Sequence, residues 1–496
     1  MILIAIGLLL NLIGFSFFNL RDYHTLEYKE KNDYYIKNNF PQNLFKPFSY
    51  FLVKMIEICT IGGYNEVGKN STAIKIDNEV YVLDLGIHLE NYVKHTQDED
   101  IVDISPNELM RVGAVPDVSV INDWKNNVKM IMPTHAHLDH LGAIPYIANN
   151  FKADIMCTPF TSEVLKGILT EDKIKLNGKI KSMSSNSSFQ AYNNVKIEFV
   201  HVTHSTPQTV MIALHTKNGI ILYANDFKFD LFPTLGKKPN FKRLEELGKQ
   251  KVLALICDST YAADARKMPS ESIAKEMLRE VMLGIDSKNK HVVVTTFSSH
   301  IARLNSIVEF GQKMNRKIVF MGRSMAKYVK AAEATGIAKF TNKVEILKYS
   351  GQIKKRLRKI AKERGKYLMV VTGHQGEPKS VLAKMMNNEL KFKFMPEDHI
   401  IFSCRTIPTP TNIANRERLE ANLRSFNVRI FKDIHQSGHA AREDLRELIN
   451  LVKPQHLIPA HGEPRMLNAL ADLAAEMGYK KGSNVHVMKN GERIKL

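Results

Sequence analysis

The sequence predicts an α/β fold, and two features of its pattern carry that prediction. From residue 55 onward, short β-branched runs such as residues 80–83 and 220–223 alternate with turn-rich clusters, which is typical of strands. After Asp258, strand-like runs at residues 292–294 and 317–320 alternate with amphipathic helical segments, the first at residues 301–314. Strands that alternate with helices indicate a parallel sheet wrapped by helices.

Length and charge restrict the class of protein. With 496 residues, 44% of them hydrophobic, the chain is long enough for two or three domains that each have a core. Seventy Lys and Arg residues against 51 Asp and Glu residues give a formal charge of +19, which favours a polyanionic partner. Charge alone leaves open the alternative of a basic, solvated surface without such a partner.

The four cysteines indicate the compartment. Cys59, Cys157, Cys257 and Cys404 form no Cys-x-x-Cys pair and lie mostly in apolar stretches. We therefore expect buried thiols in a reducing cytosol, and neither disulfides nor zinc ligands.

Residues 1–20 carry no charge and are almost continuously apolar, which is the length and composition of a membrane-spanning helix. They lack the basic start and the cleavage site of a secretory signal. Residues 1–54 show no clean periodicity, whereas a strand pattern begins just after Met55. We expect residues 1–54 to be an apolar extension ahead of a true start at Met55, and the protein to be cytoplasmic. A genuine membrane anchor is the competing interpretation.

The strongest local signal is the string Thr134-His135-Ala136-His137-Leu138-Asp139-His140, which follows a strand and precedes a helix expected near residues 141–149. Its four potential ligands can serve two metal ions, because a loop can direct the first two histidines to one ion and Asp139 and His140 to the other. Imidazole and carboxylate groups suit Zn²⁺, although the ligand types also allow Mn²⁺ or Fe²⁺. A His-rich surface loop is the alternative.

Three further candidate ligands, His204, Asp226 and His461, follow strands later in the chain. Each one alone would more often be an ordinary loop residue. Their order after the His-x-His-x-Asp-His string makes them reinforce one another as a metal constellation. Because α/β sheets usually carry their chemistry in the loops after strands, we expect the site along one edge of a sheet.

With this constellation the chain resembles the metallo-β-lactamase superfamily. The resemblance implies a four-layer αββα sandwich with a dinuclear zinc site at one edge. Asp84, which follows the strand at residues 80–83, matches the first motif of the superfamily and would orient ligands by hydrogen bonds; a turn-capping aspartate is the alternative. The implied zinc ligands are His135, His137 and His204 for the first ion, Asp139, His140 and His461 for the second, and Asp226 as the bridge.

Asp226 and His461 are 235 positions apart, and an insertion of that size matches the β-CASP group, the nucleic-acid-processing branch of the superfamily. The motifs of this group would be Asp258 in Asp258-Ser259-Thr260, then His439, then His461. The resemblance implies a metallo-β-lactamase domain in two parts, residues 55–260 and 426–496, with a parallel α/β β-CASP domain inserted at residues 261–425.

More specifically, the chain from residue 55 to its C-terminus resembles the ribonuclease J family, in its shorter archaeal form. Two departures from the bacterial pattern stand out. Gln208 occupies a position where bacterial relatives commonly have Asp, and 35 residues follow His461 where those relatives have a C-terminal domain. The matching strings are residues 62–70, 322–325, 372–378, 435–439 and 459–463.

The resemblance also implies the roles of the other site residues. His439 would donate a hydrogen bond to the phosphate or protonate the departing 3′ oxygen, and a neutral structural histidine is the alternative. Arg323 and Ser324 would hold a second phosphate, with the arginine acting through its bidentate fork. Asp84, Asp139 and Asp258 would complete the catalytic set with His439. The expected phosphate-binding loop consists of His435, Gln436, Ser437, Gly438 and His439.

The function expected from the resemblance is that of a zinc-dependent ribonuclease with two Zn²⁺ ions per chain. It would degrade single-stranded RNA 5′ to 3′ from a 5′-monophosphate end, in RNA decay and maturation, as a homodimer. A β-CASP endoribonuclease is the alternative. A non-catalytic RNA-binding scaffold is disfavoured because no ligand is missing, and a thioester hydrolase is disfavoured by the 235-position separation and the basic charge.

Overall fold

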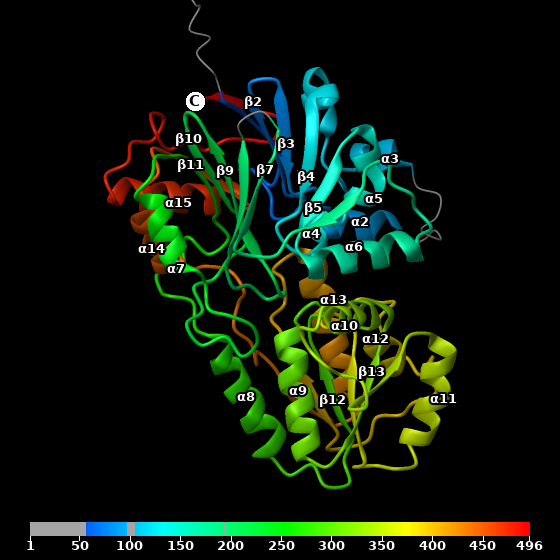
Figure 1. Ribbon diagram of the computed structural model, residues 1–496. Helices are drawn as coiled ribbons and strands as arrows, with labels where there is room; N and C mark the ends of the chain where they lie inside the picture. The colour runs from blue at the N-terminus through cyan, green and yellow to red at the C-terminus, as the bar shows by residue number, and fades with distance from the viewer. Residues whose placement is uncertain (1–55, 97–104, 193–194) are drawn as a thin grey trace, which may run out of the picture. The chain divides into compact units, whose positions relative to one another are not determined.

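The computed structural model describes residues 56–96, 105–192 and 195–496 (Figure 1). The expected extension at residues 1–54, the start at Met55 and the possible anchor at residues 1–20 lie outside these residues. Within the described ranges, no helix is both long enough and apolar enough to cross a membrane.

Two mixed sheets form the first part of the fold. Strands β1, β2, β3 and β19 of the first sheet pair antiparallel, whereas β3, β4, β5 and β6 run parallel. In spatial order, this sheet is β19 (Arg493–Lys495), β1 (Ile56–Gly62), β2 (Ser71–Ile76), β3 (Glu79–Leu83), β4 (Val128–Met132), β5 (Asp154–Cys157) and β6 (Ile180–Ser182). The second sheet is β18 (His456–Ala460), β11 (Val252–Asp258), β10 (Gly219–Ala224), β9 (Val210–Thr216), β8 (Lys196–His201) and β7 (Ser187–Gln190).

Strand β10 shows why these two sheets stack. Its side chains point alternately to the two faces of the sheet, as in any strand. Ile221 and Tyr223 join an apolar cluster with β1 to β4 of the first sheet, whereas Ile220, Leu222 and Ala224 join a cluster with helices. A strand that is apolar on both faces requires a layer on each side. The result is the expected αββα sandwich.

Helices cover the outer faces of both sheets (Figure 1). The outer face of the first sheet is covered by α2 (Leu89–Thr96), α3 (Pro106–Arg111), the 3₁₀ helices η2 (Val118–Asn127) and η3 (Ala148–Asn150), α4 (Leu138–Leu141), α5 (Ile144–Ile147) and α6 (Pro159–Glu171). The outer face of the second sheet is covered by α7 (Phe241–Gly248), α14 (Arg442–Val452) and α15 (Pro464–Glu476).

The third sheet is parallel throughout, as its strand and helix alternation predicts. Its order is β14 (Val344–Leu347), β13 (Lys317–Met321), β15 (Tyr367–Val371), β12 (Val292–Thr295), β16 (His399–Phe402) and β17 (Arg429–Phe431). One face packs on α8 (Glu271–Leu283), α9 (Ile301–Lys313) and α10 (Arg323–Ala334). The other face packs on α11 (Ser350–Ile360), α12 (Val381–Met386) and α13 (Pro410–Arg424).

The chain leaves the sandwich and returns to it around this third sheet. Strand β11 precedes the third sheet in the sequence and β18 follows it, yet the two strands pair in parallel, with Ile256 opposite Ile458. Strand β19 then pairs with β1, the first described strand. This topology is consistent with a first boundary near residue 260. The second boundary lies later than the expected residue 425, because β17 (Arg429–Phe431) still pairs with β16 in the third sheet.

One expected helix is wrong in its extent. The single helix expected near residues 141–149 is divided into α4, which ends at Leu141, and α5, which begins at Ile144. Pro145 explains the break, because a proline has no backbone N–H to donate to the carbonyl of Leu141. Elsewhere the expected strands are confirmed within one or two residues. The four cysteines are free and buried, as expected.

A buried ion pair joins α8 to α9 and also holds the segments that follow β16 and β17. The guanidinium of Arg303, which is 0% exposed, donates from Nε and Nη2 to the Glu271 carboxylate at 2.6 and 2.7 Å. Its Nη1 donates to the carbonyl oxygens of Ser403 and Ile434, on the segments that follow β16 and β17. Burial raises the pKa of Glu271, but the adjacent Arg303 outweighs burial and holds that pKa well below its usual range.

We expect Arg303→Met to destabilise the protein by roughly 3–5 kcal/mol, because it leaves the Glu271 carboxylate buried without its partner. The shift of the urea unfolding midpoint measures the effect. Arg279→Met is the matched control, since Arg279 pairs with Glu276 on an exposed face of α8 and should change the midpoint little. Equal midpoints for Arg303→Met and the parent protein would contradict the importance of this pair.

Candidate metal centre

The candidate ligands follow strands whose ends meet at one edge of the sandwich. His135 and His137 lie just after β4, Asp226 after β10 and His461 after β18. Three of the site residues have a left-handed backbone, with φ of 58° at Asp84, 53° at Asp226 and 53° at His461. Such angles cost energy in non-glycine residues and often occur at functional sites. The strand ends are therefore shaped to turn these side chains toward a common centre.

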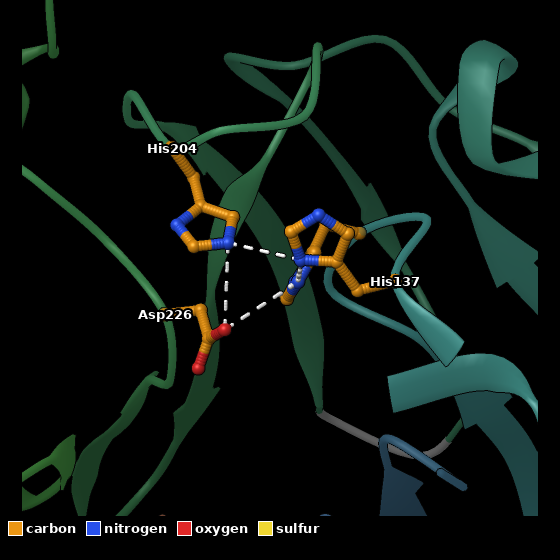
Figure 2. Close-up of side chains that lie close together, drawn as sticks. His137, His204 and Asp226 are labelled. Carbon is orange, nitrogen blue, oxygen red and sulfur yellow. Dashed lines mark hydrogen bonds and ion pairs between the residues drawn. The ribbon is translucent and has the colours of Figure 1, made fainter. Parts of the chain in front are cut away.

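Four of the predicted ligands, His135, His137, His204 and Asp226, form a first cluster. Figure 2 labels His137, His204 and Asp226. His137 Nδ1 lies 3.0 Å from His135 Nε2 and 3.1 Å from His204 Nε2. Asp226 Oδ2 lies 3.6 Å from His135 Nε2 and 3.5 Å from His204 Nε2. Zn–N and Zn–O distances of about 2.0–2.2 Å in a tetrahedron imply ligand separations of roughly 3.3–3.6 Å, close to these values.

A second cluster shares Asp226 with the first. His140 Nε2 lies 3.4 Å from Asp139 Oδ2 and 3.2 Å from Asp226 Oδ2. His461 Nε2 lies 3.8 Å from Asp139 Oδ2 and 3.6 Å from Asp226 Oδ1. The seven predicted ligands therefore come together as two sets with one carboxylate in common.

The donor set fits two divalent cations. Asp226 is 1% exposed, and its Oδ1 has no hydrogen-bond partner, so a buried carboxylate oxygen points into the centre unsatisfied. Asp84 and Asp258 are also buried, and the side chain of Asp139 is mostly buried. These four carboxylates carry four negative charges when the histidines are neutral. Two divalent cations would balance that charge.

The outward nitrogen of each ring is fixed by a hydrogen bond, which is the usual arrangement for metal-binding histidines. When the inward nitrogen faces a metal, His140 Nδ1–H donates to Asp84 Oδ2 at 2.8 Å. In the same way, His204 Nδ1–H donates to the Gly438 carbonyl at 2.7 Å. His135 Nδ1–H donates to Thr134 Oγ1 at 3.0 Å. The rings are thus oriented before any metal binds.

Asp84 and Asn70 each hydrogen-bond to candidate ligand histidines. Asp84 accepts hydrogen bonds from the Thr134 backbone N–H at 2.7 Å and from the Tyr223 hydroxyl at 3.0 Å, in addition to His140. Asn70 Oδ1 accepts from His461 Nδ1 at 2.7 Å, and its Nδ2 lies 3.1 Å from His140 Nε2. Sequence reasoning assigned no role to Asn70. The sequence feature that could have identified Asn70 was its position at the end of the matching string at residues 62–70.

The electrostatics divide the histidines into two groups. Burial holds the pKa of His135 and His204 well below the usual range and lowers the pKa of His137 to about 4. These three rings are therefore neutral at neutral pH, which is the form that binds a metal. Burial also acts on His140, but the carboxylates of Asp226, Asp84 and Asp139 outweigh it and raise its pKa.

His439 lies beside both clusters and is held by Asp258. Its Nδ1 contacts Asp258 Oδ2 at 2.8 Å, and its Nε2 lies 3.8 Å from Asp226 Oδ2. Thr260 donates to Asp258 Oδ1 from both its backbone N–H and its hydroxyl. Burial lowers the pKa of His439, but Asp226 and Asp258 outweigh it and raise that pKa to about 9. A cation in the centre would oppose this rise, because it offsets the same carboxylates.

Contacts with buried residues hold the loop at residues 435–439 in place. The buried Lys228 donates from Nζ to the Ser437 carbonyl at 3.0 Å. The Ser437 hydroxyl accepts from the His439 backbone N–H at 3.1 Å, and Gln436 Nε2 lies 4.0 Å from Met277 Sδ. His435 is buried, its Nδ1 has no hydrogen-bond partner, and burial lowers its pKa to about 2. The loop is therefore fixed against the metal centre.

A Cβ on Gly438 would approach His204 Nδ1 to 2.9 Å and the Ser205 backbone nitrogen to 2.7 Å. Only glycine lets this loop pass so close to a candidate ligand.

Arg323 and Ser324 start α10, directly after β13, and both are exposed. The Ser324 hydroxyl contacts the Ser298 hydroxyl at 3.0 Å. Ser298 is followed by Ser299, whose hydroxyl contacts His137. The pair thus belongs to the loops at the carboxyl ends of the third sheet, which face the metal centre.

Gln208, the departure from the bacterial pattern, has a structural contact. Its Oε1 accepts a hydrogen bond from the backbone N–H of Phe160, in the first turn of α6, at 2.8 Å. It therefore satisfies an N–H group at a helix start, where the helix has no internal acceptor.

Comparisons with known proteins agree with this geometry. Residues 289–418 match the family described as "Ribonuclease J, beta-CASP domain", and residues 426–488 match "Zn-dependent metallo-hydrolase RNA specificity domain". The crystal structure of a protein of unknown function from Enterococcus faecalis shares the fold, with a TM-score of 0.61 over 89% of this chain and 100% of that one, at 15% identity.

Among curated proteins, this chain is 40% identical to ribonuclease J from Methanocaldococcus jannaschii, over 88% of this chain and 98% of the relative. It is also 40% identical to ribonuclease J from Pyrococcus abyssi, over 90% of this chain and 98% of that protein. Ribonuclease J 1 from Streptococcus pyogenes is 29% identical, with 89% of this chain matched to 74% of that protein. With two paired clusters of histidines and aspartates and these relatives, the chain belongs to the ribonuclease J family.

Proposed function

We propose that this protein is a two-metal ribonuclease that hydrolyses single-stranded RNA from a 5′-monophosphate end and releases mononucleotides. The observation that carries the proposal is the pair of ligand clusters joined by Asp226, next to loops from a parallel sheet. The relatives at 40% identity are named ribonuclease J, which supports RNA as the substrate. The formal charge of +19 favours the same polyanion.

Two divalent ions would activate the attacking water and offset charge on the phosphoryl oxygens. The types of ligand in the two clusters favour Zn²⁺ for both ions. The chain's own groups supply the rest of the chemistry. Asp226 holds both ligand sets in register, and Asp84 and Asn70 orient His140 and His461. Four ligand rings are already fixed by neighbours within the sandwich or the loop after it, so little reorganisation is needed at the moment of reaction.

His439 is our proposed proton donor. Its Nδ1 is bound to Asp258, so the proton at Nε2 faces the centre and can be given to the departing 3′ oxygen or shared with a phosphoryl oxygen. The Asp258 carboxylate keeps the ring oriented and stabilises its cationic form. Ser437 and Gly438, on the loop fixed by Lys228, would contact the scissile phosphate.

A second phosphate site would determine the end of the RNA at which degradation starts. Arg323 and Ser324 are exposed at the carboxyl end of β13, where an arginine fork can bind a terminal phosphate. A site that fits one phosphate would favour a 5′-monophosphate over a triphosphate. The expected homodimer and the cytoplasmic location stay predictions.

The first prediction concerns metal content. Purified protein should hold two metal ions per chain, and His137→Ala should lose metal and abolish RNA cleavage, because one ligand of the first cluster is removed. Elemental analysis after gel filtration measures the stoichiometry. His201→Ala is the matched control, since His201 ends β8 but lies outside both clusters. Near-normal turnover and full metal content in His137→Ala would show that the ligand assignment is wrong.

The second prediction concerns direction. RNA labelled at a 5′-monophosphate should release labelled mononucleotide first, and a 5′-triphosphate should slow the reaction. Arg323→Ala should reduce the preference for the monophosphate, whereas Lys330→Ala, an exposed cation on the same helix, should not. Oligonucleotides released from the 3′ end, or efficient cleavage of circular RNA, would overturn the exonuclease proposal in favour of an endonuclease.

The third prediction separates the two stacked histidines, His439 and His461, whose ring centroids are 5.6 Å apart. His439→Ala should lower the cleavage rate by on the order of 100-fold or more and keep both metals, because a proton donor is lost. His461→Ala should lose activity and also weaken the second metal. Metal content and single-turnover rates of both variants are measured together. If both variants shed metal equally, the division between them fails.

A further inference from the structure

We infer that the inserted segment completes the first metal cluster: Ser299 and Tyr328, which come from the third sheet and its helices, hold His137 in its metal-binding orientation. Both are positioning residues. The inference rests on the proposed metal site, and it extends that site to residues outside the sandwich.

Ser299 acts on the ring of His137 directly. His137 Nδ1 faces His135 and His204, so its Nε2 points away from the centre, and Ser299 Oγ lies 3.0 Å from that nitrogen. When Nδ1 binds a metal through its lone pair, the ring proton is on Nε2 and donates to the serine oxygen. Ser299 is 6% exposed, so water has little access to replace it. The serine therefore fixes both the tautomer and the rotation of the ring.

Tyr328 holds the backbone between two ligands. Its hydroxyl donates to the carbonyl oxygen of Ala136, which separates His135 from His137, at 2.9 Å. Burial raises the pKa of Tyr328, so the hydroxyl remains a proton donor at physiological pH. Its ring contacts Phe160 of α6, with centroids 6.4 Å apart, so the side chain is itself held in place.

His137 differs from the other four candidate ligand histidines in this respect. The outward nitrogens of His135, His140 and His461 are bound by Thr134, Asp84 and Asn70, all from the first sheet's loops. His204 binds the Gly438 carbonyl, on the segment that returns to the sandwich. Among these five histidines, His137 is the one whose outward nitrogen contacts a residue between β11 and β17, so its contact depends directly on how the third sheet docks. Metal affinity at the first cluster and docking of the inserted segment are therefore linked.

The direct test is the metal affinity of the full chain, measured by competition with a chromogenic zinc chelator, with no RNA present. Ser299→Ala should weaken one of the two Zn²⁺ sites by about 10- to 100-fold and leave the other unchanged. Tyr328→Phe should weaken the same site, and Ser299→Thr, which keeps the hydroxyl, should restore most of the affinity. Ser298→Ala is the matched control for metal affinity, because that hydroxyl binds Ser324 instead of a ligand.

Hydrogen exchange gives a second readout. Because linkage is reciprocal, zinc should slow amide exchange in residues 296–300 and in α10 of the parent protein. This protection should shrink in Ser299→Ala. Parental affinity at both sites in Ser299→Ala and in the Ser299→Ala/Tyr328→Phe double variant would overturn the inference. That outcome is distinct from failure of the ribonuclease proposal, which would appear as normal zinc binding by the parent protein without RNA cleavage.

Discussion

The buried carboxylate of Asp226 is the constraint on which the rest of the centre depends. It is shared by both clusters, it is 1% exposed, and one of its oxygens accepts no hydrogen bond. A buried anion of this kind is costly unless positive charge lies beside it. The surrounding imidazole rings, each held by a hydrogen bond at its outward nitrogen, form a site for that positive charge. The positive φ at Asp226 and His461 follows from the same need to turn side chains from different strands toward one point.

The buried Arg303–Glu271 pair and the Lys228 contact extend this order to the loop after β17. Arg303 binds the Ile434 carbonyl and Lys228 binds the Ser437 carbonyl, so two buried cations hold the loop that carries His439. The ion pair and the metal ligands thus lie around the same loop, the one that carries His439. A change at Arg303 would therefore reach the site without touching a metal ligand.

Much of this arrangement could be predicted from the sequence, because each candidate ligand is identified by a local pattern, a strand followed by His or Asp. The His-x-His-x-Asp-His string and the three later strand ends predicted the seven residues that the structure brings together. The parallel third sheet followed from the alternation of strands and helices. The break at Pro145 was missed because the apolar pattern of residues 141–149 hid it.

The contacts that were not predicted are long-range. Asn70 meets His461, Ser299 meets His137, and Tyr328 meets Ala136 across separations of 391, 162 and 192 positions. No periodicity or spacing reports which strand end will lie opposite which loop. Polar residues directly after a buried strand, as at residues 296–300 after β12, were the available hint, and they mark a candidate without naming its partner.

The pairing of early and late strands has a consequence for synthesis. Strand β1 pairs with β19, and β11 pairs with β18, so each sheet of the sandwich combines strands that precede the third sheet in the sequence with a strand that follows it. His439 and His461 come after the whole third sheet in the order of translation. A nascent chain that has not yet reached residue 439 has neither histidine, and such distant pairings also close slowly. Until that stage of translation, the proposed centre would lack both its proton donor and a ligand of its second metal.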